Sequence, residues 1–220
     1  MNKMFFIPAI CAALLLTSCG GSSKVEESGK VAEASAAALT YEIDSASSNV
    51  AWLAKKVTGQ HSGTVAIKSG KLQTDSGKIS AGNFILDMTS VAVTDMPATD
   101  ENNGKLVGHL KSEDFFSVEK NPSANFDIVS VEPIAGAAAG VANYTVKGNL
   151  TIKGISKAIT FPATIDMTPE MVSAKATFEL DRTEWDIKFL SGKFFKDLGD
   201  KVIYDNFQIT FDLKAKVKTA

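Results

Sequence analysis

The chain from Asn206 to Val217 alternates between apolar and polar residues. Every second position is a large apolar side chain: Phe207, Ile209, Phe211 and Leu213. Successive side chains of a β-strand point to opposite faces of the sheet. The alternation therefore predicts a strand with one apolar and one solvated face.

Shorter runs of the same period occur earlier in the chain. The apolar positions in these runs are Phe84, Leu86 and Met88, and then Phe178 and Leu180. Residues 146–152 and 159–167 are also predicted strands. Pro162 in the second of these indicates an edge or a bulge, because proline cannot donate a ladder hydrogen bond. Glycine-containing turns separate the runs, and many short strands with tight turns favour an all-β antiparallel sandwich or barrel.

The main helical candidate is the segment 105–116. Leu106 and Leu110 share one helical face, but the segment is short and contains Gly108, so it cannot stand alone as a helix. Ser112 is a candidate cap for a second turn, which predicts two brief helical pieces. We expect Phe115 and Phe116 to fasten this helical cover to the sheet.

The apolar strand faces raise the possibility of an internal cavity. In a single-layer barrel these faces can point only inward, and about eight strands leave an interior that either side chains or one small ligand can fill. About 20 buried carbons at roughly 0.8 kcal/mol each would give roughly 16 kcal/mol, against an association cost of about 4–15 kcal/mol. Pattern alone does not separate a lipid cavity from a filled core.

The first forty residues have the layout of an exported lipoprotein. Lys3 precedes an apolar run from Met4 to Leu16, and Thr17 and Ser18 lead to Cys19. We expect residues 1–18 to be a signal peptide and Cys19 to carry the lipid anchor, the alternative being an ordinary signal peptide that contains a cysteine. Residues 19–40 lack large apolar side chains and are predicted to be a lipidated, flexible tether. The expected location is the bacterial envelope, on an outer membrane facing the periplasm or the cell surface.

The charges and motifs argue against several function classes. The formal net charge is −2 with both signs mixed throughout, which makes a nucleic-acid partner unexpected. The chain has no nucleophile elbow, phosphate loop or zinc-protease motif. We therefore expect no enzymatic activity, no metal site and no cofactor. Two alternatives stay open at this point: catalysis with His109 as a general base oriented by Glu113, and a tethered interaction module with a filled barrel.

Several motifs in order resemble the YceI-like family of bacterial exported proteins. They begin with Tyr41-x-Ile43-Asp44, continue with His109-Leu110-Lys111-Ser112 and residues 148–157, and include Arg182-Thr183-Glu184-Trp185. The match covers Tyr41 to about Lys216, so residues 41–220 are taken as one YceI-like domain. Two departures are the segment 94–104, which lacks a basic residue, and Asp186, which replaces a glycine.

The resemblance implies an eight-stranded antiparallel lipocalin-like barrel with a short helical cover. Its lumen would hold an isoprenoid lipid such as a quinone or a prenyl phosphate. The expected partners are this lipid and a membrane reached through the anchor, with a homodimer possible. The candidate ligand-binding residues are Phe84, Leu86, Met88, Phe126, Phe161, Phe178, Trp185, Phe207, Ile209 and Phe211.

Overall fold

The computed structural model describes residues 23–218, so the predicted signal peptide and the Cys19 anchor lie outside the described residues. Within them, ten strands form a single sheet that closes on itself. The elements in chain order are β1 (Lys24–Glu27), β2 (Leu39–Ile43), β3 (Asn49–Lys56), β4 (Gly59–Asp75), β5 (Lys78–Val93), α1 (Glu101–Lys111), β6 (Ser123–Pro133), β7 (Tyr144–Ile152), β8 (Ile155–Met167), β9 (Met171–Asp181), the 3₁₀ helices η1 (Arg182–Trp185) and η2 (Gly199–Lys201), and β10 (Ile203–Val217).

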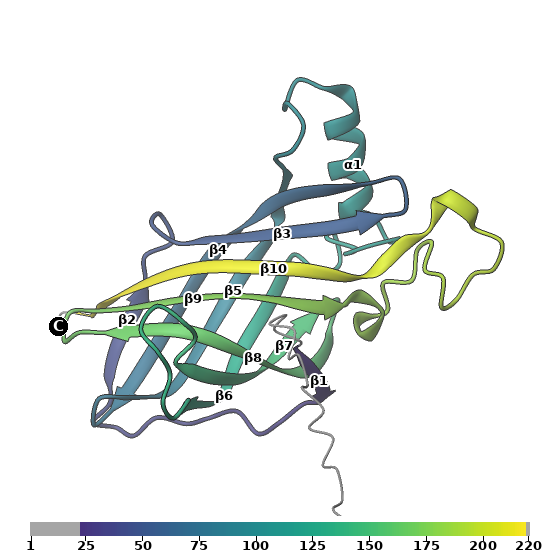
Figure 1. Ribbon diagram of the computed structural model, residues 1–220. Helices are drawn as coiled ribbons and strands as arrows, with labels where there is room; N and C mark the ends of the chain where they lie inside the picture. Colours follow the sequence, from purple (N-terminus) through teal and green to yellow (C-terminus); the bar gives the residue numbers. More distant parts are fainter. Residues whose placement is uncertain (1–22, 219–220) are drawn as a thin grey trace, which may run out of the picture.

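The closed sheet is an antiparallel barrel of eight strand positions. β2 and β3 share one position, because both pair with β4 on one side and with β10 on the other. Each of the strands from β4 to β10 then occupies one further position, with β8–β9 pairing completing the ring. Figure 1 shows these strands winding obliquely around one interior. The prediction of an eight-stranded barrel with a short helical cover is confirmed.

The seam between β8 and β9 is paired over only part of its length. The two strands pair from Thr164 and Lys175 to Met167 and Val172. The remainder of β8 is an edge, and Pro162 lies on it, as its missing N–H group requires. β1 pairs with this same edge, against residues 157–160.

The described part of the predicted flexible tether is ordered, which corrects that prediction. β1 adds to the edge of β8, and Val25 packs against the core. The chain then crosses the outside of the barrel, where the Gly29 N–H donates to Asn149 Oδ1 (2.8 Å) and Asn149 Nδ2 donates to the Gly29 carbonyl (2.7 Å). Figure 1 shows this purple segment running along the barrel to β2. Composition does not predict this order, because the open edge of β8 supplies backbone partners that the segment lacks by itself.

Ion pairs add to the attachment of β1. Glu26 lies 2.9 Å from Lys147 and 2.5 Å from Lys24, and these bonds, that from Lys147 first, lower the pKa of Glu26 to about 2. A carboxyl group whose pKa is lowered by folding stabilises the fold above its ordinary pKa and loses this effect as the pH falls toward the lowered value. The contribution of Glu26 is therefore complete at neutral pH and lost between about pH 4.5 and about pH 2.

Replacing Asn149 with alanine is expected to release the N-terminal segment while the barrel stays folded. Loss of two hydrogen bonds, at about 1 kcal/mol each, should raise the opening equilibrium of residues 24–32 about 30-fold. Amide hydrogen exchange measures this opening. The control is Asn143→Ala, since Asn143 makes the equivalent pair of bonds to Ile165 (2.9 and 2.8 Å) away from the segment. Unchanged amide exchange of residues 24–32 in Asn149→Ala would contradict the role of the Asn149–Gly29 hydrogen bonds in holding this segment.

The helical cover is one helix rather than the two pieces predicted. It begins earlier, because the Asp100 carboxylate caps it by accepting from the Asn102 N–H (2.8 Å). The buried Asn103 side chain fixes the helix to the end of β5 by donating to the Val93 carbonyl (3.1 Å). Phe115 and Phe116 follow in turns and pack on the core as expected. No helix among residues 23–218 is long and apolar enough to cross a membrane.

Candidate functional site

An apolar cavity of about 220 Å³ lies inside the barrel. Nine of the ten predicted ligand-binding residues line it: Phe84, Leu86, Met88, Phe126, Phe161, Phe178, Phe207, Ile209 and Phe211. Their side chains reach one interior because each occupies the inward-facing positions of its strand. Of the 36 described lining residues, Arg182 alone is charged. Contact between these nine predicted residues and a ligand stays a prediction.

Phenylalanine rings from neighbouring strands form one wall of the cavity. The Phe161 and Phe178 rings are stacked, with centroids 4.2 Å apart and planes at 10°. Phe211 meets Phe161 edge to face at 5.8 Å, and Phe126 lies 5.8 Å from Phe161. Phe126 can lie there because Gly148, two residues before its partner Leu150 on β7, has no side chain, and a Cβ atom at Gly148 would come within 2.2 Å of the Phe126 ring. The wall is therefore continuous and lacks hydrogen-bonding groups.

The cavity opens at the end of the barrel that carries α1 and η1. Tyr204, which is 49 % exposed, is the most exposed of the described lining residues. It lies in a bulge of β10, because Ile203 and Phe207 are four residues apart while their partners on β3, Lys56 and Ala54, are two apart. The bulge interrupts the regular pairing of β10 with β3 between Ile203 and Phe207. We use the term mouth for this opening.

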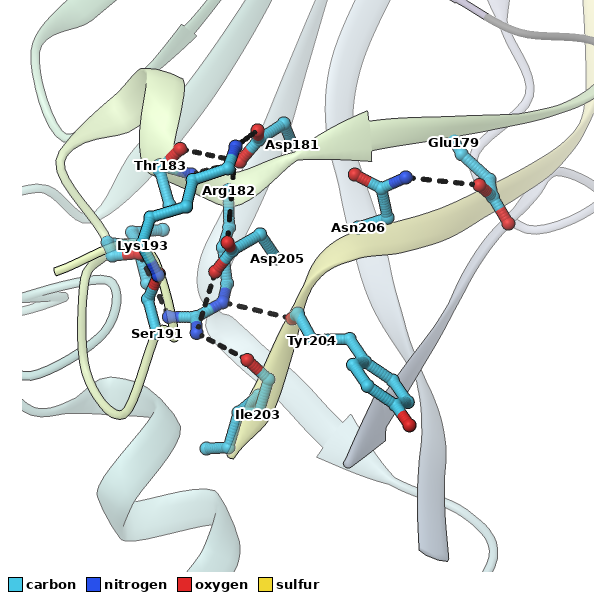
Figure 2. Close-up of polar contacts among 11 residues, drawn as sticks. Glu179, Asp181, Arg182, Thr183, Ser191, Lys193, Ile203, Tyr204, Asp205 and Asn206 are labelled. Carbon is cyan, nitrogen blue, oxygen red and sulfur yellow. Dashed lines mark hydrogen bonds and ion pairs between the residues drawn. The ribbon is translucent and has the colours of Figure 1, made fainter. Parts of the chain in front are cut away.

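Arg182 is buried beside the mouth and binds three backbone carbonyl groups. Its Nη1 donates to Ile187 O (2.9 Å), its Nη2 to Ile203 O (3.0 Å) and its Nε to Tyr204 O (3.2 Å). Asp205 Oδ1 lies 3.2 Å from Nη2 as an ion pair without hydrogen-bond alignment. Figure 2 shows how this network ties the start of β10 to η1. Arg182 thus holds the mouth together.

The charges around Arg182 balance one another. Burial lowers the pKa of Arg182, and the neighbouring Asp205 and Asp181 oppose that effect. Burial by itself would raise the pKa of Asp181, but the bonds from Lys193 and Thr183 leave it lowered. Asp181 is therefore paired with Lys193, and Asp205 lies beside Arg182 as its counter-ion. Among the described charged residues of this network, only Arg182 lines the cavity.

The two tryptophans differ from the sequence prediction. Trp185, a predicted ligand-binding residue, does not line the cavity: it is completely buried in η1, and its Nε1 donates to Leu150 O (3.0 Å). Its role is packing, because it belongs to η1 rather than to an inward-facing position of a strand. Trp52 does line the cavity, and its buried Nε1 has no hydrogen-bond partner among the described residues.

Sequence reasoning missed several residues at the mouth. Arg182 and Trp52 are not among the predicted ligand-binding residues, although the arginine of the Arg-Thr-Glu-Trp motif was an available signal. Leu110, Phe115 and Phe116 line the cavity from the helical cover. Their selection would have required knowing that the cover lies over the mouth.

His109 and Glu113 do not form the acid–base pair that the alternative of catalysis required. His109 Nε2 lies 2.9 Å from Asp114 Oδ2, whereas Glu113 binds Lys120, because the helix ends at Lys111 and Glu113 leaves the face of His109. The His109 ring packs edge-on against Phe189 at 4.7 Å. His61 Nδ1 lies 2.9 Å from Asp95. Among residues 23–218, no three His, Cys, Asp or Glu side chains are grouped to bind a metal ion.

Comparisons with solved structures support the barrel assignment. BcnA of Burkholderia cenocepacia aligns with a TM-score of 0.59 and 24 % identity over 79 % of this chain and 99 % of that one. A polyisoprenoid-binding domain from Saccharophagus degradans, implicated in plant cell wall breakdown, aligns with a TM-score of 0.56 and 13 % identity over 82 % of this chain and 99 % of that one. At these identities the likeness shows the fold alone.

Sequence comparisons identify the family. A UPF0312 protein of Pseudomonas aeruginosa strain LESB58 is 31 % identical over 88 residues, which are 37 % of this chain and 43 % of that protein. A UPF0312 protein of Shewanella denitrificans is 30 % identical over 43 % of this chain and 44 % of its own length. The chain thus matches less than half the length of these curated relatives. The model of the YceI-like domain matches residues 41–215, and the chain belongs to the YceI-like domain family.

Proposed function

We propose that this protein binds an isoprenoid lipid inside its barrel and carries it within the bacterial envelope. The supporting observation is the apolar cavity, which is open at one end. Among its described lining residues only Arg182 is charged, and Arg182 is already paired with Asp205. The YceI-like fold supports lipid binding in general, and the structural neighbour from Saccharophagus degradans is named for polyisoprenoid binding. A long, methyl-branched chain would match a lumen made of phenylalanine and aliphatic side chains.

The polar groups at the mouth favour a lipid with an uncharged head group. Arg182 is compensated by Asp205 and already donates to three carbonyl groups. The described lining residues offer no free cation to a phosphate buried inside the cavity, and burying an unpaired charge is costly. The polar groups left for a ligand are the Trp52 N–H and the Tyr204 hydroxyl, which suit a carbonyl or hydroxyl oxygen. We therefore favour a quinone or a prenylated phenol over a prenyl phosphate.

Binding without covalent chemistry completes the proposed activity. The YceI-like family is a family of binding domains, and the His109–Glu113 pair that would have favoured catalysis is not formed. A signal peptide over residues 1–18, a lipid anchor at Cys19 and an outer-membrane location are parts of the proposal that rest on the sequence. A homodimer stays a further possibility.

Extraction of the purified full chain with organic solvent, followed by mass spectrometry, tests the proposal. We expect an uncharged isoprenoid lipid that is absent from an unrelated exported protein purified in parallel. An extract without lipid would contradict lipid carriage. A co-purified prenyl phosphate would support carriage and contradict the uncharged head group.

A further inference from the structure

Exposed aromatic side chains are concentrated around the mouth. All three exposed aromatic residues among residues 23–218 lie there: Phe194 (50 % exposed), Phe195 (49 %) and Tyr204 (49 %). Val57, 46 % exposed, belongs to the adjacent β3–β4 hairpin. We call residues 55–57, 192–201 and Tyr204 together the mouth surface. Clustered exposed apolar side chains of this kind mark contact surfaces, because leaving them in water is unfavourable.

Hydrogen bonds hold the mouth surface in place. Ser191 is completely buried, and its carbonyl accepts from the Phe194 N–H (3.1 Å) and the Phe195 N–H (3.0 Å). The Val57 N–H donates to Val202 O (3.1 Å), which joins the hairpin to the loop. In Figure 1 this loop projects beyond the end of the barrel. The phenylalanines are therefore presented by an ordered turn, so binding costs little additional ordering.

The mouth surface carries an excess of positive charge. Lys55, Lys56, Lys196 and Lys201 are exposed and form no ion pair with any described residue. The unpaired carboxylates of the same surface are Asp197 and Asp200, so four lysines less two aspartates leave an excess of two positive charges. Lysines around exposed phenylalanines fit a membrane surface, where anionic head groups attract the ammonium groups and the rings enter the boundary with the acyl chains.

The N-terminal segment starts near this surface. The Ser23 hydroxyl donates to the Glu179 carbonyl on β9, and two residues further on, Asp181 binds Lys193 of the mouth surface. Cys19 lies four residues before Ser23, which limits its distance from Ser23 to about 14 Å. A lipid attached at Cys19 would therefore enter a bilayer close to the mouth.

We propose that the mouth surface docks on an anionic lipid bilayer, with Phe194 and Phe195 inserted between the head groups. The cavity then opens onto the membrane, and an isoprenoid chain passes between the bilayer and the barrel without crossing bulk water. The inference rests on the proposed lipid-carrying function. It adds the partner, which is the membrane surface, and the contacting residues.

Vesicle co-sedimentation tests the docking surface. The protein used is the proposed mature chain, residues 19–220, with Cys19→Ala, so that neither the signal peptide nor the proposed anchor itself retains it. The vesicles contain equal parts of phosphatidylethanolamine and phosphatidylglycerol, with phosphatidylcholine vesicles for comparison. We expect binding to the anionic vesicles that weakens with added salt. Adding Phe194→Ser and Phe195→Ser should lower the partition coefficient at least about tenfold.

The β6–β7 loop offers a matched control. Ile134 and Val141, 36 % and 52 % exposed, lie at the opposite end of the barrel, and Ile134→Ser with Val141→Ser should change binding less than about twofold. Equal loss in both double variants, or no vesicle binding by the parent, would overturn docking. A dimer that Phe194→Ser and Phe195→Ser dissociate would assign the surface to a second copy instead. Solvent extraction of the same proteins is independent, so retained lipid without vesicle binding refutes docking alone.

Discussion

Replacing Phe211 with aspartate is expected to remove the bound lipid from the purified protein. The Phe211 ring lies on the cavity wall and meets the Phe161 and Phe178 rings edge to face at 5.8 and 6.2 Å. A carboxylate at this position would be buried without a partner, which costs several kcal/mol unless it takes up a proton or admits water. Either outcome makes the lumen unfavourable for an apolar chain. Mass spectrometry of the solvent extract measures the loss.

Two companion variants separate lipid loss from unfolding. Thr210→Asp places the same charge one residue earlier, on the exposed face of β10, and should retain the lipid. Phe211→Leu keeps an apolar side chain and should retain it as well, with a stability loss of about 1–2 kcal/mol. Circular dichroism establishes that each variant is folded. A folded Phe211→Asp protein that keeps its full lipid content would show that the lipid lies outside this cavity.

Period-two alternation explains why the cavity lining could be predicted from sequence. Phe207, Ile209 and Phe211 occupy alternate positions of one strand, so a single decision about which face is buried places all three. The same reasoning placed Phe84, Leu86 and Met88 on β5. These assignments depend on local pattern and on closure of the sheet. Assigning a side chain to the inner face in this way does not require knowing which strands are neighbours.

Features that depend on distant partners could not be predicted in the same way. Residues 24–27 have a composition typical of a tether, and only the unpaired edge of β8, more than 120 residues later, makes them a strand. Asp205 balances Arg182 because a bulge in β10 brings it alongside η1. Trp185 does not line the cavity, because the direction of its side chain is set by η1, and residue type alone does not give that direction. Periodicity carries no information on these contacts.

Replacing Arg182 with methionine is expected to destabilise the protein by about 3–5 kcal/mol, because it removes one partner of a buried ion pair and leaves the Asp205 carboxylate only the 3.9 Å contact to Lys193. Asp205 is 13 % exposed, so water compensates it poorly. The carbonyl groups of Ile187, Ile203 and Tyr204 lose their donor at the same time. Urea denaturation measures the change. Lys175→Met is the control, since its pair with Asp212 is exposed and should contribute less than about 1 kcal/mol.

A second substitution distinguishes charge compensation from the carbonyl bonds. Adding Asp205→Asn to Arg182→Met removes the carboxylate whose remaining cation is Lys193, 3.9 Å away, and should recover about 1–3 kcal/mol of the loss. The remainder then belongs to the three carbonyl groups, which tie β10 to η1 at the mouth. If the double variant is no more stable than Arg182→Met, the buried charge is not the main cost, and Arg182 acts chiefly as a backbone clamp. If Arg182→Met is as stable as the parent, the network does not hold the mouth together, and the Arg182 guanidinium is then available to a charged head group.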